Sequence, residues 1–487
     1  MKSPRQPTVQ LINLGCAKNV VDSEEILGCL HRDGFAIRGS GRRADVVVVN
    51  TCGFLESARE ESLSVIREAA RRKRRGEIKR LVVAGCLAQR ARDELAAIPG
   101  VDAVIGPGQN ERVAAIAAGS AERQLVEVAE RPVHQWSPVP VRMLSTPPWS
   151  AYLKISEGCD HPCAFCTIPS IRGPHTSKPF DAVLREAEDL AAAGVKEFNL
   201  VAQDTTRYGQ DLPGHPDLSE LLRALSEVDG IRWIRVFYAY PSAQVYRLAE
   251  TMAELPRVCR YLDMPLQHSD GTLLRRMRRP GDGERYLRMI EQIRETAPGI
   301  ALRTTFIVGL PGETEEAFEG LLRFVEQARF DRVGVFEFSP ETGTDAATME
   351  DQVEPTVRRH RRERLMRLQQ DISLDVHRGW IGRELEVLVE SVQGGVGIGR
   401  SYRDGPEVDG TVRVAACSAR PGEFCTVRIK HADVYDLGGV MTTRPGAVTA
   451  AGNGAFGVEG RDRGTRDTLT TTVRPAAGRP SSMEAKL

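Results

Sequence analysis

Short apolar runs alternate with amphipathic stretches along the N-terminal quarter of the chain. Residues 9–14, 46–49 and 81–84 have the length and apolar character of buried strands. Residues 22–31 and 56–72, which lie between them, place apolar side chains at helical spacings of three and four. Because strands that alternate with helices form parallel sheets, we expect a parallel-sheet α/β domain over residues 7–128.

A proline-rich segment separates this domain from a second series of strand–helix units. Residues 129–150 contain Pro132, Pro138, Pro140, Pro147 and Pro148 and show no apolar period, as in a semi-rigid linker. In the next domain, residues 151–378, the expected strands are 152–156, 197–202, 233–239, 261–266, 302–308 and 333–338. Helical patterns lie between most of them. Six such units predict a partial (β/α)6 barrel, with chemistry at the carboxyl ends of the strands.

The C-terminal part of the chain has a different pattern. Residues 355–380 read as one long helix with a single apolar stripe. Short β-like runs separated by Gly- and Asp-containing turns follow, and they predict a small antiparallel, OB-like β-barrel over residues 379–441. Residues 442–487 are rich in Gly, Ala, Thr and Arg with few large apolar side chains, which predicts a disordered tail.

Composition and charge narrow the class of protein. The chain has 487 residues, with 66 basic and 66 acidic side chains, so no global field attracts nucleic acid or a membrane. Residues 71–75 and 358–362 are Arg-rich, and we expect both runs to be solvated helix faces. No signal core and no apolar run of ~18 residues is present, so we expect a cytoplasmic protein without membrane contact.

The spacing of three cysteines is the strongest chemical signal. Cys159, Cys163 and Cys166 form a C-x3-C-x2-C pattern just after an expected strand. Thiolates are the usual ligands of iron–sulfur clusters, which normally have four, so three would leave one iron open to another molecule. A zinc knuckle with His161 as a stand-in ligand is the alternative, but His161 lies too close in sequence to both neighbouring cysteines.

A second set of cysteines falls at equivalent places in the first domain. Cys16, Cys52 and Cys86 each lie two or three residues past the carboxyl end of an expected strand, where loops of a parallel sheet converge. We expect them to hold a second cluster that is again one ligand short; three buried core cysteines are the alternative. The remaining cysteines, Cys29, Cys259, Cys417 and Cys425, have no partner at metal spacing and fit core positions.

The loop around Cys159 resembles that of the radical S-adenosylmethionine (SAM) enzymes. Their C-x3-C-x-aromatic-C motif matches Cys159, Cys163, Phe165 and Cys166. The resemblance implies that the open iron binds SAM, which an electron from the cluster cleaves to a carbon radical. Phe165, Gln203 after the second barrel strand, and Gly309 in the Gly-rich turn after the fifth are the expected SAM contacts.

Residues 7–440 as a whole are similar to the methylthiotransferases of that superfamily. The resemblance implies two 4Fe–4S clusters, an auxiliary one on Cys16, Cys52 and Cys86 and a SAM cluster on Cys159, Cys163 and Cys166. It identifies the terminal barrel with that family's TRAM domain. The runs Leu14-Gly15-Cys16-Ala17-Lys18-Asn19 and Ile168-Pro169-Ser170-Ile171-Arg172-Gly173 resemble the branch that modifies a ribosomal protein.

The implied substrate is an aspartate of small-subunit ribosomal protein number twelve, either free or on the ribosome. The implied reaction places a methylthio group on the β-carbon and uses two SAM molecules, one as methyl donor and one as radical source. An electron-donor protein of flavodoxin or ferredoxin type is the further expected partner. The nearest alternative is a transfer-RNA adenosine as substrate (MiaB type), which the balanced charge disfavours. A two-cluster electron carrier is the alternative of another class, although carriers concentrate their cysteines in short repeats.

Overall fold

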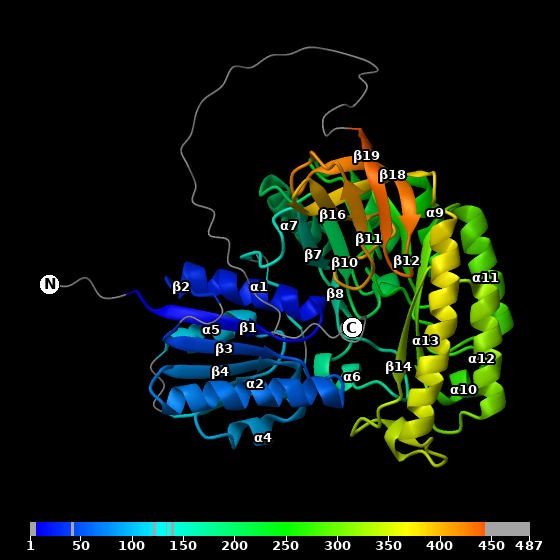
Figure 1. Ribbon diagram of the computed structural model, residues 1–487. Coiled ribbons are helices and arrows are strands. Elements are labelled where there is room, and N and C mark those ends of the chain that lie inside the picture. The colour runs from blue at the N-terminus through cyan, green and yellow to red at the C-terminus, as the bar shows by residue number, and fades with distance from the viewer. Residues whose placement is uncertain (1–5, 40–42, 120–122, 133, 138–140, 444–487) are drawn as a thin grey trace, which may run out of the picture.

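The computed structural model describes residues 6–39, 43–119, 123–132, 134–137 and 141–443. It has an N-terminal α/β part, a central part built on a second parallel sheet, and a small terminal barrel (Figure 1). No helix in the described residues combines the length and apolarity needed to cross a bilayer. Most of the predicted tail, residues 442–487, lies outside the described residues.

The N-terminal part is a six-stranded parallel sheet with helices on both faces. Its strands are in the order β2-β1-β3-β4-β5-β6. Alternate residues of β3 explain the two layers: Val48 packs with Leu30 of α1 on one face, and Val49 packs with Leu63 of α2 on the other. The elements are β1 (Thr8–Asn13), α1 (Ala17–Arg32), β2 (Ala36–Ile37), β3 (Val46–Thr51), α2 (Glu56–Arg74), β4 (Arg80–Gly85), α3 (Cys86–Arg90), α4 (Arg92–Ala96), β5 (Ala103–Ile105), α5 (Asn110–Ala118) and β6 (Leu125–Glu127).

The central part is an open parallel sheet of six strands in the order β14-β13-β12-β11-β10-β7, with the helices outside it (Figure 1). This is the predicted partial barrel. Its main units are β7 (Ser150–Lys154), α7 (Phe180–Ala192), β10 (Glu197–Val201), α8 (Leu218–Ser226), β11 (Trp233–Val236), α9 (Gln244–Glu254), β12 (Val258–Asp263), α11 (Gly283–Thr296), β13 (Ala301–Val308), α12 (Glu315–Ala328) and β14 (Arg332–Glu337). Short elements between them are β8 (Ser156–Glu157), α6 (Ile168–Arg172), β9 (Thr176–Ser177), α10 (Gly271–Arg276) and two 3-10 turns, Thr205–Arg207 and Asp345–Thr348.

The long helix α13 (Pro355–Arg378) packs along β14 and α12 and leads into the terminal barrel. That barrel is closed, as predicted, in the order β15-β16-β17-β19-β18. One of its pairs, β17–β19, is parallel: β19 forms a hairpin with β18 and therefore runs alongside β17 in the same direction. The strands are β15 (Glu384–Gln393), β16 (Val396–Ser401), β17 (Val412–Ala415), β18 (Phe424–Ala432) and β19 (Leu437–Thr443).

Buried ion pairs fasten the terminal barrel to the central sheet. The two terminal nitrogens of Arg400 donate to the two oxygens of the Glu197 carboxylate, at 3.0 and 2.6 Å. Arg235 donates a third hydrogen bond to this carboxylate at 3.2 Å. Arg332 of β14 likewise donates to Asp404 at 2.6 Å. All of these side chains are buried, so the ion pairs lie inside the junction between the barrel and the central sheet.

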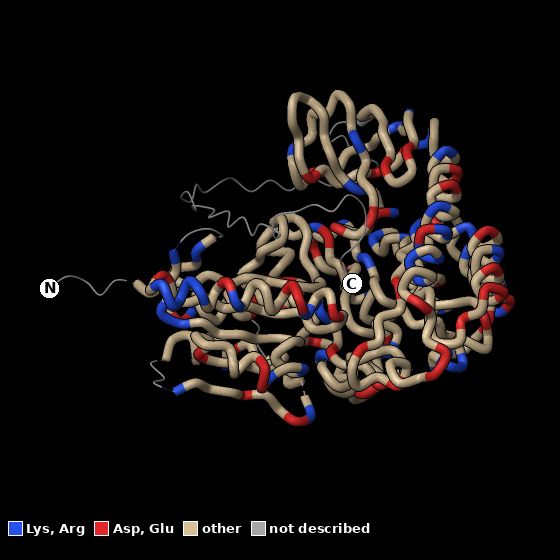
Figure 2. Tube along the Cα trace, turned by 60° about the horizontal axis from the view of Figure 1, so that its bottom comes forward, with Lys and Arg blue, Asp and Glu red and all other residues tan. Residues whose placement is uncertain are grey.

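Basic and acidic residues are interspersed over all three parts of the molecule (Figure 2). Within this mixed distribution, the two Arg-rich runs lie in different environments. The run at residues 71–75 forms ion pairs at the carboxyl end of α2, as expected of a helix face. The expectation for residues 358–362 was wrong in part, because Arg358 and Arg361 are buried. Arg358 donates to the Phe338 and Val353 carbonyls and Arg361 to the Glu313 carbonyl, so they satisfy buried backbone acceptors.

Candidate functional site

Three cysteines meet at the carboxyl edge of the N-terminal sheet. Cys16 lies between β1 and α1, Cys52 directly follows β3, and Cys86 opens α3 immediately after β4. Since β1, β3 and β4 are neighbours in the sheet, their loops lie side by side. Gly15 makes a close approach possible: its φ is +101°, and a Cβ there would lie 2.8 Å from the Cβ of Cys52. The structure thus brings the three predicted auxiliary ligands together.

The second set of cysteines lies on the loop between β8 and α6. The backbone N–H of Cys159 donates to the Gly173 carbonyl at 3.0 Å, and that of Cys166 donates to the Cys163 carbonyl at 3.1 Å. Gly158, at φ +77°, would place a Cβ 2.0 Å from the Pro174 carbonyl oxygen, so only glycine fits the return of the chain. These backbone contacts fold the loop back on itself and hold its thiols near one another.

Burial and the nearness of the other thiols raise the pKa of cysteines in both sets. Burial first, and then the neighbouring Cys86 and Cys16 thiols, raise the pKa of Cys52 to about 12. Burial, followed by the Cys163 and Cys159 thiols, also raises the pKa of Cys166 to about 12. Thiols held together in this way are costly to ionise unless a cation binds them, which is what a cluster of iron ions provides. The donor sets therefore fit iron–sulfur clusters.

The geometry does not suit a single metal ion. In the part of the chain that the structure describes, no three His, Cys, Asp or Glu side chains are grouped so that they could hold one. The His161 ring is engaged elsewhere: it bonds to the Asp204 carboxylate at 2.7 Å and stacks on Tyr240 at 3.7 Å. Each thiolate of a cluster binds its own iron, so the thiolates need not converge on one point. The zinc-knuckle alternative therefore finds no support here.

Arg172 joins the two cysteine sets. It is the last residue of α6, and its Nε donates to the Cys86 thiol at 3.2 Å. The same guanidinium donates to Glu157 at 3.0 Å, and Glu157 precedes Cys159 by two residues. It also contacts Asp22 of α1 at 2.8 Å. One buried side chain thus spans the N-terminal sheet and the central sheet at the cysteine loops.

Lys154 completes this buried charge cluster. Its ammonium lies between the carboxylates of Asp22 and Glu157, and none of these side chains is more than 4% exposed. Although burial opposes ionisation, Arg172 and Lys154 lower the pKa of Glu157 well below its ordinary value, and the same two cations lower the pKa of Asp22. Both carboxylates are therefore ionised and paired at neutral pH.

A second contact joins the same two parts at the far side of the cysteine loops. Arg90 of α3 donates to the carbonyl of Gly53, next to Cys52, at 2.7 Å. Its guanidinium also reaches the Glu341 carboxylate of the central part at 3.0 Å, and Glu341 in turn accepts the N–H of Glu56 at 3.0 Å. Glu341 therefore caps α2, which has no capping side chain of its own.

The predicted SAM contacts lie in three different settings. Gln203 donates to Glu157 at 2.5 Å, and its buried Oε1 has no partner in the described structure. Phe165 packs against the central core. The N–H of Gly309 donates to the Glu313 carboxylate, and a Cβ at Gly309 would lie 2.2 Å from Cγ of Arg358. Gly309 thus has a packing role of its own, and a contact of these residues with SAM stays a prediction.

Sequence reasoning missed the charged residues that connect the two parts. Arg172 and Lys18 lie within the two motifs named above, but their spacing from other residues does not mark either one as functional. The pairing of Arg90 with Glu341 joins residues far apart in the chain, and it has no sequence signal. The four remaining cysteines, Cys29, Cys259, Cys417 and Cys425, are buried core residues as expected, although Cys417 lies just past β17.

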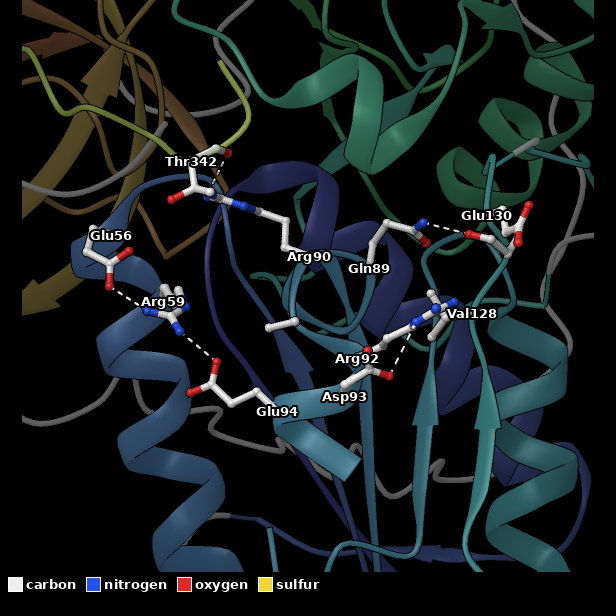
Figure 3. Close-up of a pocket in the computed structure, with 12 residues that line it drawn as sticks. Glu56, Arg59, Gln89, Arg90, Arg92, Asp93, Glu94, Val128, Glu130 and Thr342 are labelled. Carbon is white, nitrogen blue, oxygen red and sulfur yellow. Dashed lines mark hydrogen bonds and ion pairs between the residues drawn. The ribbon is translucent and has the colours of Figure 1, made fainter. Parts of the chain in front are cut away.

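A pocket of about 690 Å³ lies next to the Arg90–Glu341 contact (Figure 3). Residues of α2, α3, α4 and the segment after β6 line it, with Thr342 closing it from the central part. Its charged side chains pair largely with one another, as Arg59 does with Glu56 and Glu94. None of the predicted site residues lines it.

Known families match the chain in succession. Residues 8–106 match the family described as Uncharacterized protein family UPF0004, residues 153–325 the radical SAM superfamily, and residues 381–441 the TRAM domain. A protein of Anaeromyxobacter sp. (strain Fw109-5), named ribosomal protein uS12 methylthiotransferase RimO, is 50% identical over 440 residues. The match covers 90% of this chain and 93% of that relative. The chain belongs to the RimO family of radical SAM methylthiotransferases.

Further relatives with the same printed name support the assignment. The protein of Symbiobacterium thermophilum is 47% identical over 447 residues, covering 90% of this chain and 92% of the relative. That of Geobacter sulfurreducens is 44% identical over 435 residues, covering 88% and 97%. Among solved structures, the radical SAM methyltransferase TsrM of Kitasatospora setae has a TM-score of 0.51 at 16% identity, over 80% of this chain and 79% of that one. That likeness shows the shared fold alone.

Proposed function

We propose that this enzyme places a methylthio group on the β-carbon of an aspartate in ribosomal protein uS12, in the cytoplasm. The relatives' printed name supplies the protein substrate, and the motifs around Cys16 and Cys159 support the same branch. The observation that carries a coupled reaction is the contact of Arg172 with both the Cys86 thiol and Glu157. Sulfur transfer requires two centres at one substrate, and this contact fixes the two cysteine sets relative to each other.

The proposed cofactors follow from the donor sets. Cys16, Cys52 and Cys86 would hold the auxiliary 4Fe–4S cluster, and Cys159, Cys163 and Cys166 the SAM cluster, with Phe165, Gln203 and Gly309 near SAM. When bound, these groups supply a carbon radical and a methylthio group, which acid–base catalysis cannot provide at an unactivated carbon. An electron-donor protein of flavodoxin or ferredoxin type would deliver the electron.

The surrounding side chains provide rigidity and exclude water. Asp22, Lys154, Glu157 and Arg172 are each at most 4% exposed and are paired with one another. A buried, fully paired network of this kind holds one arrangement, because moving any member leaves a charge without its partner. A reactive carbon radical needs such a dry and fixed surrounding.

The test uses anaerobically reconstituted enzyme with SAM, a reductant and either a uS12 loop peptide or transfer RNA. Wild-type enzyme should increase the peptide mass by replacement of hydrogen with a methylthio group. Cys52→Ala should keep about half of the iron and still cleave SAM, because the Cys159 loop is intact, but should transfer no sulfur. Cys29→Ala, which removes a buried cysteine outside both sets, should retain both clusters and the transfer activity.

Two results would overturn the proposal. A mass gain on transfer RNA and none on the peptide would replace the substrate while leaving the enzyme class in place. Normal sulfur transfer by Cys52→Ala would remove the auxiliary cluster from the reaction.

A further inference from the structure

Lys18 stands at the junction of the two cysteine sets. It is the second residue of α1, two residues after Cys16, and it reaches from the N-terminal part to the central part. Its Nζ donates to the Ala202 carbonyl, just past β10, at 3.3 Å. The same ammonium lies 3.9 Å from the centre of the Tyr238 ring, just past β11. Lys18 therefore reaches the carboxyl edge of the central sheet, the edge at which parallel-sheet enzymes bind their substrates.

The ammonium of Lys18 has no direct carboxylate partner in the described structure. Neighbouring buried cations pair with carboxylates: Lys154 and Arg172 share Asp22 and Glu157. Among the described residues, no carboxylate forms an ion pair with Lys18; its contacts are one carbonyl and one aromatic face. An ammonium has three N–H donors, so the contact with Ala202 leaves donors for another acceptor. These donors remain available to a carboxylate of a bound molecule.

Arg279 is another cation near the cysteines that the described structure leaves without a carboxylate. Its guanidinium lies over Tyr240, donates to the Pro265 carbonyl and approaches the Cys163 thiol at 3.9 Å. It therefore belongs to the SAM-cluster loop. Lys18 lies instead beside Cys16 of the auxiliary set, from which the sulfur would come.

The surroundings of Lys18 are open and strained. Gly15 is exposed, and Cys16, Ala17 and Lys18 are half-buried, so solvent reaches the first turn of α1. No side chain caps that turn, whose N–H groups add positive potential. Tyr238 has a φ of +60°, a conformation that non-glycine residues seldom adopt and that is enriched at ligand sites. Hydrogen bonds from Thr205 to the Tyr238 carbonyl, at 3.1 and 3.3 Å, hold it there.

We propose that Lys18 binds the side-chain carboxylate of the substrate aspartate and determines the choice of aspartate over its neutral analogues. This inference rests on the proposed function. The β-carbon is bonded directly to the carboxyl carbon, so fixing the carboxylate against Lys18 also fixes the carbon that reacts. The cation–π contact with Tyr238 orients the ammonium before the substrate arrives. Lys18 is a specificity residue in this account and transfers no proton or electron.

The test compares wild-type holoenzyme with Lys18→Met and Lys18→Arg on two peptides that differ only in having Asp or Asn at the target position. Lys18→Met should bind the Asp peptide about 10- to 100-fold more weakly than wild type does, which is the range that one charge-assisted hydrogen bond supplies. The variant's KM for this peptide should rise accordingly, and its preference for Asp over Asn should disappear. Lys18→Arg keeps the charge and should retain part of the preference. Lys79→Met, which removes a largely exposed lysine paired with Asp45, serves as the control and should match wild type.

Iron content and SAM cleavage of each variant separate a folding defect from a binding defect. If Lys18→Met keeps both clusters and binds the Asp peptide like wild type, with an unchanged Asp preference, the inference is overturned. If Lys18→Met fails to fold, the wild-type enzyme alone still tests the inference: equal affinity of wild type for the Asp and Asn peptides would overturn the inference as well. If wild-type enzyme modifies neither peptide, the proposed function fails instead, a result distinguishable because it appears without any substitution.

Discussion

The contact between Arg90 and Glu341 gives the sharpest stability prediction. Glu341 is 3% exposed and accepts from Arg90, from the Glu56 backbone and from the Ser339 hydroxyl at 2.7 Å. Glu341→Gln keeps the shape but removes the charge, and it turns an amide NH₂ toward one of these donors. The loss of one charge-assisted hydrogen bond and of the ion pair should cost about 2–3 kcal/mol. The cost falls on the attachment of α2 and the Cys52 loop to the central part.

Hydrogen exchange measured by mass spectrometry tests this directly. Peptides covering residues 52–60 should exchange about 30- to 150-fold faster in Glu341→Gln, because exchange through local opening follows the opening free energy. Glu94→Gln alters a more exposed ion pair of the same pocket, with Arg59 (Figure 3), and should change exchange by less than about fivefold. Equal exchange in Glu341→Gln and wild type would refute the assignment of Glu341 as the capping side chain of α2.

Two further predictions concern a glycine and a carboxylate. Gly309→Ala should lower the melting temperature more than Gly343→Ala does: both residues have positive φ, but the new Cβ meets the Arg358 side chain at Gly309 and nothing within 4 Å at Gly343. Equal decreases in melting temperature would show that the positive φ alone, and not the contact with Arg358, causes the destabilisation. Although burial opposes ionisation of Glu197, Arg400 and Arg235 lower its pKa from 4.5 to about 2. Its stabilising effect is therefore full above pH 4.5 and is lost as the pH falls toward 2. Glu197→Gln should be less stable than wild type at pH 7. Its free energy of unfolding, measured between pH 6 and 3, should depend less steeply on pH than that of wild type.

The architecture was largely predictable because its periodic signals are strong. The apolar run of β3 and the helical spacing of residues 56–72 each have one interpretation, and the structure places β3 and α2 within two residues of the expected positions. The start of α1 was missed by five residues. Its first turn carries Ala17, Lys18 and Asn19, which serve the junction between the two parts and show no apolar period.

The grouping of the cysteines was also predictable, since carboxyl ends of neighbouring parallel strands meet at one edge. The contacts between the groups were not. Arg172 to Cys86, Arg90 to Glu341 and Lys18 to Tyr238 all join residues distant in the chain. The burial of Arg358 ran against expectation for the same reason: a charged run looks solvated until the backbone acceptors around it are known.

The buried ion pairs between the terminal barrel and the central sheet have a consequence for unfolding. Glu197 pairs with Arg400 and Arg235, and Arg332 pairs with Asp404 beside them. Unfolding of the barrel alone would leave Arg332 without Asp404 and Glu197 without Arg400, and buried charges without partners are strongly destabilising. The barrel and the central sheet therefore form one cooperative unit of stability.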